Sequence, residues 1–542
     1  MFAVTIVALA ATAEVGQTSP LGDVAIVGAG ASGVAMAKAF LQQGCRSLTV
    51  YEKGSSVGGH WAWKPNYVGV GVQNKRDAYR YTDMAMVGQG PRASAAEVVD
   101  YLRSYADAHG FSQNIRLHTE VLRIVEREQC GGRRRLITRN TITHEEATHD
   151  VDLVVLAPGI VPFLPPAAAD VAFKGKVVHS SQLDEALVSE AIARGAQVVI
   201  VGGGKSASEC VAGLREAGHP ASLIRCVASS ASTCALFEPQ LWPHLVQRPF
   251  LALFAWSARL ARSERALWQV LARLLRWPLF WFGLLVASPI GGGGPTLNGQ
   301  VMNSRLMRLM RGVRATRGRM AGLEEGSVRC SDGQRLPADL VVCATGFRIT
   351  VPPLYVEQAD SSKGAGDGPR TQDEGEGVST ATHAGWRGRW RRCAIEEEQP
   401  LLFRSMVLPR TPYIAALLYN SMGINAMFSS ELMAAWLVHF YASGRAECFR
   451  GMEEVMPDEA PLRELGGGEP FNTWHFDRSG EAAGGRGYAS DFYEDQIYAD
   501  LAMRPPSRDL ALTRAQHDDA YYAEAAARFR ALVESRRRGP EP

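Results

Sequence analysis

Three glycines and one acidic residue near the start of the chain have the spacing of a nucleotide-binding turn. Gly28, Gly30 and Gly33 form the pattern G-x-G-x-x-G, with Ser32 inside it. Glu52 follows the last glycine at about the 20-residue distance typical of a ribose-binding acid. The glycines would let the backbone approach a pyrophosphate, whose charge suits the N–H groups of a helix N-terminus. These residues therefore predict a dinucleotide site.

A similar pattern recurs later in the chain, with a different residue in place of the acid. The second turn reads G-x-G-x-x-A and comprises Gly202, Gly204, Lys205, Ser206 and Ala207. Arg225 is the polar residue expected at the end of the next strand. A guanidinium can bind a 2′-phosphate, whereas a carboxylate would repel it, so the pattern favours NADPH over NADH. The alternative is that Arg225 is a solvated surface charge.

Short apolar runs around both patterns predict the strands that must position them. The first turn lies between the predicted strands Asp23–Val27 and Ser47–Tyr51, with a helix to about Gln43. The second lies between the predicted strands Gln197–Val201 and Ala221–Cys226. Both motifs thus fall where a strand meets a helix, which is the context that gives a glycine-rich pattern its meaning.

Two such units separated along one chain indicate nested domains. Leu153–Leu156 is the expected last strand before the second domain, and Leu340–Cys343 the expected return to the first sheet. The predicted fold is α/β, with two nested Rossmann-like dinucleotide-binding domains, in which a smaller NADPH domain interrupts the FAD domain and carries a helical insertion. The expected divisions are a leader over 1–21, the FAD domain over 22–195 and 339–460, the NADPH domain over 196–338, and a C-terminal extension over 461–542.

The segment between the first turn and the second predicts one further helix, over Ser94–His109. It opens on a capping box, Ser94-x-x-Glu97, and Gly110 is a suitable residue to end it.

Composition narrows the classes of partner. The formal net charge is +2, too small to indicate nucleic-acid binding. The nine cysteines form no C-x-x-C pair, so the sequence predicts neither a zinc site nor a redox disulfide, and we interpret them as reduced thiols.

Three segments stand apart from this plan. Residues 249–290 are apolar with interspersed arginines, typical either of a peripheral membrane contact or of an insertion packed on the protein itself; the composition leans slightly to the membrane surface. Residues 358–392 are rich in Gly, Ser and Asp and predict a disordered insertion. The leader lacks the basic start of a secretory signal. We expect the protein in the cytoplasm or on the cytoplasmic face of an internal membrane.

The motifs together resemble those of the flavin-containing monooxygenases, over about residues 22–440. Val57–Trp61 is similar to the family's G-G-x-W, Phe173–His179 to its F-x-G-x-x-x-H fingerprint, and Ala344–Phe347 to its later A-T-G-F turn. The resemblance adds Gly59, Trp61, Thr345 and Gly346 to the expected cofactor-binding residues. Leu183, where the fingerprint usually ends in an aromatic residue, and Pro158, where threonine is usual, depart from the pattern.

What the resemblance implies is an enzyme that uses FAD, NADPH and O2. A C4a-hydroperoxyflavin would transfer one oxygen atom to a nitrogen or sulfur centre of a small, lipophilic nucleophile, as in the N-oxide-forming dimethylaniline monooxygenases. Asn74 matches the family's active-site asparagine, its alternative role being that of a turn residue. His179 would either position the domain linker or serve as a structural histidine.

Other functions remain open at this stage. A Baeyer–Villiger monooxygenase uses the same cofactors on ketones, although Leu183 weakens that interpretation. A pyridine-nucleotide disulfide reductase would need a redox cysteine pair. A flavin-binding, membrane-associated protein without catalysis is the alternative from another class.

Overall fold

The computed structural model describes the two predicted domains and the segments that join them. The described residues are 21–63, 72, 76, 79–90, 92–126, 132–168, 173–228, 304–348, 351–358, 389–393, 406–407, 411–417, 426–444, 446, 527 and 531. Asn74, residues 249–290 and nearly all of the leader and of the C-terminal extension lie outside them. Among the described helices, none is both long and apolar enough to cross a membrane.

A five-stranded parallel sheet forms the centre of the first domain. Its strands, in spatial order, are β3 (Ile115–Arg116), β2 (Ser47–Tyr51), β1 (Asp23–Val27), β7 (Leu153–Leu156) and β20 (Ile414–Ala416). The order reverses between β1 and β7, as in a doubly wound fold, and the crevice at that point is where such folds bind nucleotides.

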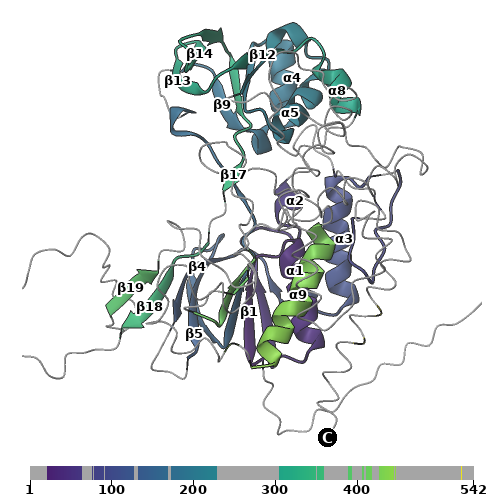
Figure 1. Cartoon of the computed structure of the whole chain (residues 1–542), viewed down its shortest axis with the longest axis vertical. Helices are drawn as coiled ribbons and strands as arrows, with labels where there is room; N and C mark the ends of the chain where they lie inside the picture. Colours follow the sequence, from purple (N-terminus) through teal and green to yellow (C-terminus); the bar gives the residue numbers. More distant parts are fainter. Residues whose placement is uncertain are drawn as a thin grey trace, which may run out of the picture.

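The two faces of this sheet are covered by different layers, because side chains alternate along each strand. Val24 and Ile26 face helices α1 (Ala31–Gln42), α3 (Ala95–Ala108) and α9 (Ala426–Ala442), whereas Ala25 and Val27 face an antiparallel layer that contains β4 and β5. Figure 1 shows the helices on one side of β1 and strands β4 and β5 on the other. The predicted capping box at Ser94 is present at the start of α3.

The antiparallel layer concerns the predicted insertion 358–392, of which residues 359–388 lie outside the described residues. In spatial order it contains β19 (Arg389–Cys393), β18 (Leu354–Gln358), β4 (Thr119–Glu126), β5 (Arg134–Asn140) and β6 (Glu146–Val151), and neighbouring strands are antiparallel except for the parallel pair β18 and β4. Both ends of the segment 358–392, predicted to be disordered, therefore lie in the paired strands β18 and β19. The pairing joins residues far apart in the sequence, which local composition does not reveal.

The second domain has its own parallel sheet. In spatial order its strands are β12 (Arg314–Arg317), β11 (Ile224–Ala228), β10 (Val198–Val201), β16 (Leu340–Cys343) and β9 (Lys176–His179). Helices α4 (Glu185–Ala193), α5 (Lys205–Glu216) and α8 (Ser304–Met310) belong to this domain, with a small antiparallel sheet of β13 (Met320–Glu324), β14 (Ser327–Cys330) and β15 (Arg335–Pro337).

The predicted domain boundaries need revision at two places. Leu340–Cys343 does not return to the first sheet; it pairs with β10 and β9 in the second. Likewise β9 and α4, placed by the sequence at the end of the first domain, belong to the second. A wholly apolar strand fits the middle of either parallel sheet, so the pattern predicts the strand but not its partner.

The chain passes between the domains through a pair of short antiparallel strands. β8 (Val161–Pro162) leads into the second domain, and β17 (Phe347–Arg348) leads out of it and pairs with β8. Figure 1 shows β17 at this connection. It is β20 and α9, later in the chain, that complete the first domain.

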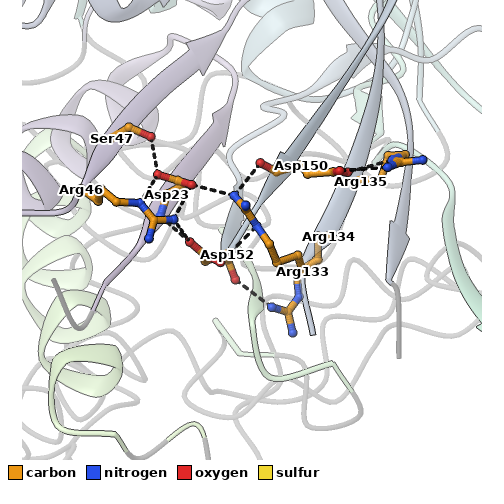
Figure 2. A network of polar contacts seen from close by, with 8 residues as sticks. All are labelled: Asp23, Arg46, Ser47, Arg133, Arg134, Arg135, Asp150 and Asp152. Carbon is orange, nitrogen blue, oxygen red and sulfur yellow. Dashed lines mark hydrogen bonds and ion pairs between the residues drawn. The ribbon is translucent and has the colours of Figure 1, made fainter. Parts of the chain in front are cut away.

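A polar network holds the amino ends of the first sheet against the antiparallel layer (Figure 2). Asp23 pairs with Arg46 and, at 2.6 Å, with Arg133, and it accepts a hydrogen bond of 2.8 Å from Ser47. Asp152 also pairs with Arg46, at 2.7 Å. The hydrogen bond from Arg46 lowers the pKa of Asp23 to about 2. Since the glycine turn follows the carboxyl end of β1, this network lies at the opposite end of the sheet.

Candidate cofactor sites and the connection between them

The first glycine turn has a shape that side chains would destroy. Gly28 has a φ of +103°, and a Cβ there would overlap the carbonyl oxygen of Ala157. A Cβ on Gly33 would overlap the carbonyl oxygen of Gly28, so this glycine lets α1 pack closely on β1. Gly30 is the N-cap residue of α1. The N–H groups at the start of α1 therefore follow directly from β1, as a pyrophosphate site requires.

Glu52 lies beside this turn, where the sequence predicts it. Its carboxylate accepts hydrogen bonds from Ala29 N at 2.8 Å and Gly54 N at 2.7 Å, and the residue is only 8% exposed. The two bonds fix the carboxylate at the carboxyl end of β2. Each oxygen can accept a second hydrogen bond, so the carboxylate retains the capacity to bind ribose hydroxyls. The residues present thus fit an adenosine dinucleotide.

A second turn packs on the first, backbone against backbone. Gly59 has a φ of +51°, and a Cβ there would lie 2.9 Å from Gly30 Cα. Gly58 N donates to Ala29 O at 3.0 Å. Trp61, in helix α2 (His60–Trp63), donates from Nε1 to the hydroxyl of Tyr79 at 3.1 Å. The structure therefore brings the predicted residues Gly30, Gly59 and Trp61 together.

Beneath the turn lies a buried charged cluster, which we call the Lys38 cluster: Lys38, Asp83 and Glu431. Lys38 Nζ lies 2.7 Å from Asp83 and 2.9 Å from Glu431. Glu431 also accepts hydrogen bonds from Thr82 N and Oγ1, at 2.8 and 2.9 Å. Burial alone would lower the pKa of Lys38, but the two carboxylates outweigh it and raise that pKa. The cluster therefore fastens α9 and the segment around Thr82 to α1.

Sequence reasoning missed this cluster, although one signal was present: Glu431 is the only acidic residue in the otherwise apolar helix α9. Ser32, predicted as a cofactor residue, adds a second tie between the same helices. Its hydroxyl lies 2.9 Å from that of Ser430.

The second glycine turn repeats the geometry of the first. Gly202 has a φ of +131°, and a Cβ there would overlap the carbonyl oxygen of Ala344. Gly204 is the N-cap residue of α5, and Lys205 and Ser206 are the first two residues of that helix. Ala207 is buried in the core of this domain, so its methyl group is accommodated where the first turn requires glycine.

Lys205 does not present an uncompensated charge at this turn. Its Nζ lies 2.9 Å from the buried carboxylate of Glu209, one helical turn further along α5. The two charges offset each other.

Arg225 does not occupy the predicted end of its strand. Gly28 N donates to Tyr51 O, and Gly202 N donates to Val227 O, both at 2.8 Å. Val227 therefore corresponds to Tyr51, and Ala228 corresponds to Glu52. Arg225 is the second residue of β11, about 10 Å before Ala228 at ~3.3 Å per residue. The prediction fails because Ala221–Leu223 form a 3₁₀ turn, so the strand begins later than its apolar pattern suggests.

The residues predicted at the later A-T-G-F turn lie at the domain connection. Thr345 Oγ1 donates to Phe163 O at 2.5 Å. Gly346 O lies 2.8 Å from His179 Nε2. His179 is fully buried, and its Nδ1 accepts a hydrogen bond from Ser181 N at 3.1 Å. His179 Nε2 therefore carries the proton and donates it to Gly346 O, which is a linker-positioning role.

One aromatic ring links the first cofactor turn to the second domain. Phe347 meets His60 edge to face, with ring centroids 5.5 Å apart, and His179 in the same manner at 4.9 Å. His60 directly follows Gly59, and His179 ends β9. The connection therefore joins the segment beside the first turn to the end of β9 in the second domain.

A family profile described as "FMO-like: Flavin-binding monooxygenase-like" matches residues 22–362, which include both turns and the connection. The chain belongs to this family. Its members use FAD and NADPH, and the two glycine turns are the candidate sites for these cofactors.

Two relatives with assigned names align with different shares of this chain. The chain is 28% identical to senecionine N-oxygenase of Tyria jacobaeae over 224 residues, 38% of this chain and 47% of that protein. It is 26% identical to the FAD-dependent monooxygenase rstn6 of Aspergillus nomiae over 444 residues, 72% of this chain and 75% of that protein. The alignment with the N-oxygenase thus spans about half of that relative.

Solved structures share the fold. The S-allyl-L-cysteine S-oxygenase from Allium sativum has a TM-score of 0.50 at 15% identity, covering 95% of this chain and 98% of that one. A cyclohexanone monooxygenase from Rhodococcus sp. Phi1, a triple mutant bound to NADP⁺, has a TM-score of 0.52 at 14% identity, covering 79% and 86%. Both therefore have two Rossmann-type domains in common with this family member.

The family fingerprint has a structural explanation in this chain. A Cβ on Gly175 would overlap both the ring of Phe173 and the carbonyl oxygen of Asp339, so the glycine lets these groups meet. Leu183, which replaces the usual aromatic residue, is fully buried in the second domain's core. The fingerprint therefore supports the second sheet and the connection between the domains.

The described cysteines carry no sign of redox chemistry. None of the described cysteines Cys45, Cys210, Cys226, Cys330 and Cys343 forms a disulfide bond. Burial raises the pKa of Cys226 to about 12 and that of Cys343 to about 11, so neither is a thiolate at neutral pH. Within the described part of the chain, nothing supports a disulfide reductase.

Proposed function

We propose that this protein is an NADPH- and O2-dependent monooxygenase that oxygenates a nitrogen or sulfur centre of a small, lipophilic molecule. The observation that carries the proposal is the pair of glycine turns, each leading directly into a helix N-terminus, in one chain of the flavin-binding monooxygenase-like family. The names of two relatives, a senecionine N-oxygenase and an N-oxide-forming dimethylaniline monooxygenase, support the choice of a nitrogen centre.

When bound, the flavin supplies the redox chemistry: it accepts hydride from NADPH and activates O2. The chain's own residues bind and orient. We assign the pyrophosphate of FAD to the start of α1, the ribose to Glu52, and the pyrophosphate of NADPH to the start of α5. Asn74 is the proposed side chain that would donate a hydrogen bond beside the reacting oxygen.

The decisive test is product analysis with the flavin-loaded protein. NADPH and isotopically labelled O2 are supplied with methyl phenyl sulfide, N,N-dimethylaniline or cyclohexanone. We expect a labelled sulfoxide or N-oxide, with one oxygen atom incorporated per NADPH oxidised. Gly28→Val is the matched control, because its side chain would close the first turn and abolish flavin binding.

Other products would assign other functions. A labelled lactone from cyclohexanone without sulfoxide or N-oxide would identify a Baeyer–Villiger monooxygenase. The likeness to cyclohexanone monooxygenase does not favour this, since at 14% identity it concerns the fold alone. Substrate-independent NADPH oxidation without any oxygenated product would indicate a flavin-binding protein that lacks the proposed catalysis.

A membrane contact through residues 249–290 is a separate part of the proposal, supported by their apolar and arginine-rich composition. Sedimentation with anionic vesicles tests it: deletion of 249–290 should abolish cosedimentation, and unchanged cosedimentation would contradict the proposal.

A further inference from the structure

The second nucleotide site lacks a charged residue where the first has Glu52. The corresponding residue is Ala228, the last residue of β11. In a nucleotide-binding unit of this strand order, the adenosine ribose lies beyond the end of this strand. A group that selects a 2′-phosphate must therefore come from a neighbouring element.

Arg317 lies at that place. It is the last residue of β12, the strand beside β11, and the register pairs it with Ala228. The next residue, Gly318, donates from its N–H to Ala228 O at 2.9 Å, which fixes the two strand ends side by side. In the first domain the bond between the equivalent strand ends runs in the opposite direction, since Glu52 N donates to Arg116 O, and the residue beside Glu52 in the register is the uncharged Leu117. The first site thus has a carboxylate just after its second strand, whereas the second site has a guanidinium at the end of the neighbouring strand β12.

The surroundings of Arg317 favour an anion. Six arginines lie between residues 305 and 319, and no acidic residue occurs from there until Glu324. Arg317 is exposed, and its side chain forms no hydrogen bond or ion pair with another described residue, while its backbone is held in the pairing of β12 with β11. Lys205 is offset by Glu209, and Arg225 lies about 10 Å back along its strand at ~3.3 Å per residue. Arg317 is therefore the cation best placed for a phosphate on the ribose.

We propose that Arg317 binds the 2′-phosphate of NADPH and makes the second site selective for NADPH over NADH. The inference rests on the proposed function only in placing NADPH at the second turn. It assigns to β12 the role that the sequence pattern gave to Arg225.

The test measures binding rather than turnover. Adenosine 2′,5′-bisphosphate and adenosine 5′-monophosphate are titrated into the flavin-loaded full-length protein by calorimetry, and the ratio of their dissociation constants isolates the 2′-phosphate. Arg317→Gln should weaken the bisphosphate by about 10- to 100-fold, as for loss of a hydrogen-bonded charge, and change the monophosphate less than about twofold. Arg317→Lys should restore part of the ratio.

Arg314→Gln is the matched control, because it removes the same charge from the same strand at its other end. We expect both it and Arg225→Gln to leave the ratio within about twofold of the wild-type value. Flavin content and the melting temperature of each variant report whether it is folded.

Three results would overturn the proposal: equal weakening of both probes by Arg317→Gln, a ratio that collapses in Arg225→Gln instead, or a wild-type protein that does not prefer the bisphosphate. None of these depends on oxygenation. The product analysis can therefore succeed while this inference fails, and the reverse also holds.

Discussion

Removing the charge of Glu431 should destabilise the first domain far more than removing the charge of an exposed residue. In the Lys38 cluster, the side chains of Lys38 and Glu431 are only 8% and 6% exposed. Glu431→Gln would leave the buried ammonium group with Asp83 alone and would turn an amide N–H toward it or toward Thr82. Breaking a buried ion pair by removing one partner typically costs about 3–5 kcal/mol of unfolding free energy.

A control pair within the same chain sets the scale. Lys174 and Glu325 also form an ion pair, but their side chains are 76% and 72% exposed. Water already solvates both charges, so Glu325→Gln should cost only about 0–1 kcal/mol. The double variant Lys38→Met, Glu431→Gln removes the buried ammonium group that has lost one of its two carboxylates. Asp83 keeps its contacts with the Tyr105 hydroxyl at 2.8 Å and with His109 Nε2 at 3.4 Å, so the double variant should recover part of the stability lost in the single variant.

The assay is urea unfolding followed by flavin fluorescence, which reports on the first domain if FAD binds at the proposed first turn. A parallel titration followed by circular dichroism checks that the remaining structure unfolds as in the wild type. The reasoning would be refuted if Glu431→Gln and Glu325→Gln lost the same free energy. It would also be refuted if the double variant were less stable than Glu431→Gln.

Three further predictions concern other parts of the chain. Gly33→Ala should abolish flavin retention because its Cβ overlaps the glycine turn, whereas Ala207→Gly should cost only about 0.5–1 kcal/mol, as both flavin content and melting temperature would show. The hydrogen bond from Arg46 lowers the pKa of Asp23 to about 2, so the ionised carboxylate stabilises the fold above about pH 4, and this stabilisation is lost as the pH falls from about 4 to about 2. In Asp23→Asn, the melting temperature should depend less on pH over that window than in the wild type. An unchanged pH dependence would contradict the assignment. His179→Ala should lower stability by about 1–3 kcal/mol without moving the pH profile of flavin reduction; a lost titration would instead indicate an acid–base role.

Local patterns were sufficient for the parts of the site that are built from local geometry. The turn at Gly28 and Gly33 and the acid at Glu52 follow from one strand, one helix and the next strand. The capping box of α3 is equally local. In such cases the residues that define the feature are close in the sequence, and their types follow directly from steric limits or hydrogen bonding.

Features that depend on distant partners were not predictable in the same way. Lys38 and Glu431 are in contact although they are 393 residues apart in the sequence, and a single acidic residue in a mainly apolar helix does not indicate which residue it pairs with. Leu340–Cys343 has the same composition as any buried strand, so only the structure assigns it to the second sheet. The position of Arg225 depended on where β11 begins, and strand boundaries are the least certain part of a pattern.

The second domain is inserted into the first between β8 and β17, and this nesting affects the order in which the chain folds during synthesis. Every described strand of the second parallel sheet lies between residues 176 and 343, so that sheet is complete before β20 and α9 leave the ribosome. The first domain, although it begins the chain, must wait for these late elements to cover β7 and α1. Domains generally fold as units during translation. A nascent chain of this protein should therefore acquire protease resistance in its middle first, and retain flavin only after α9 has emerged.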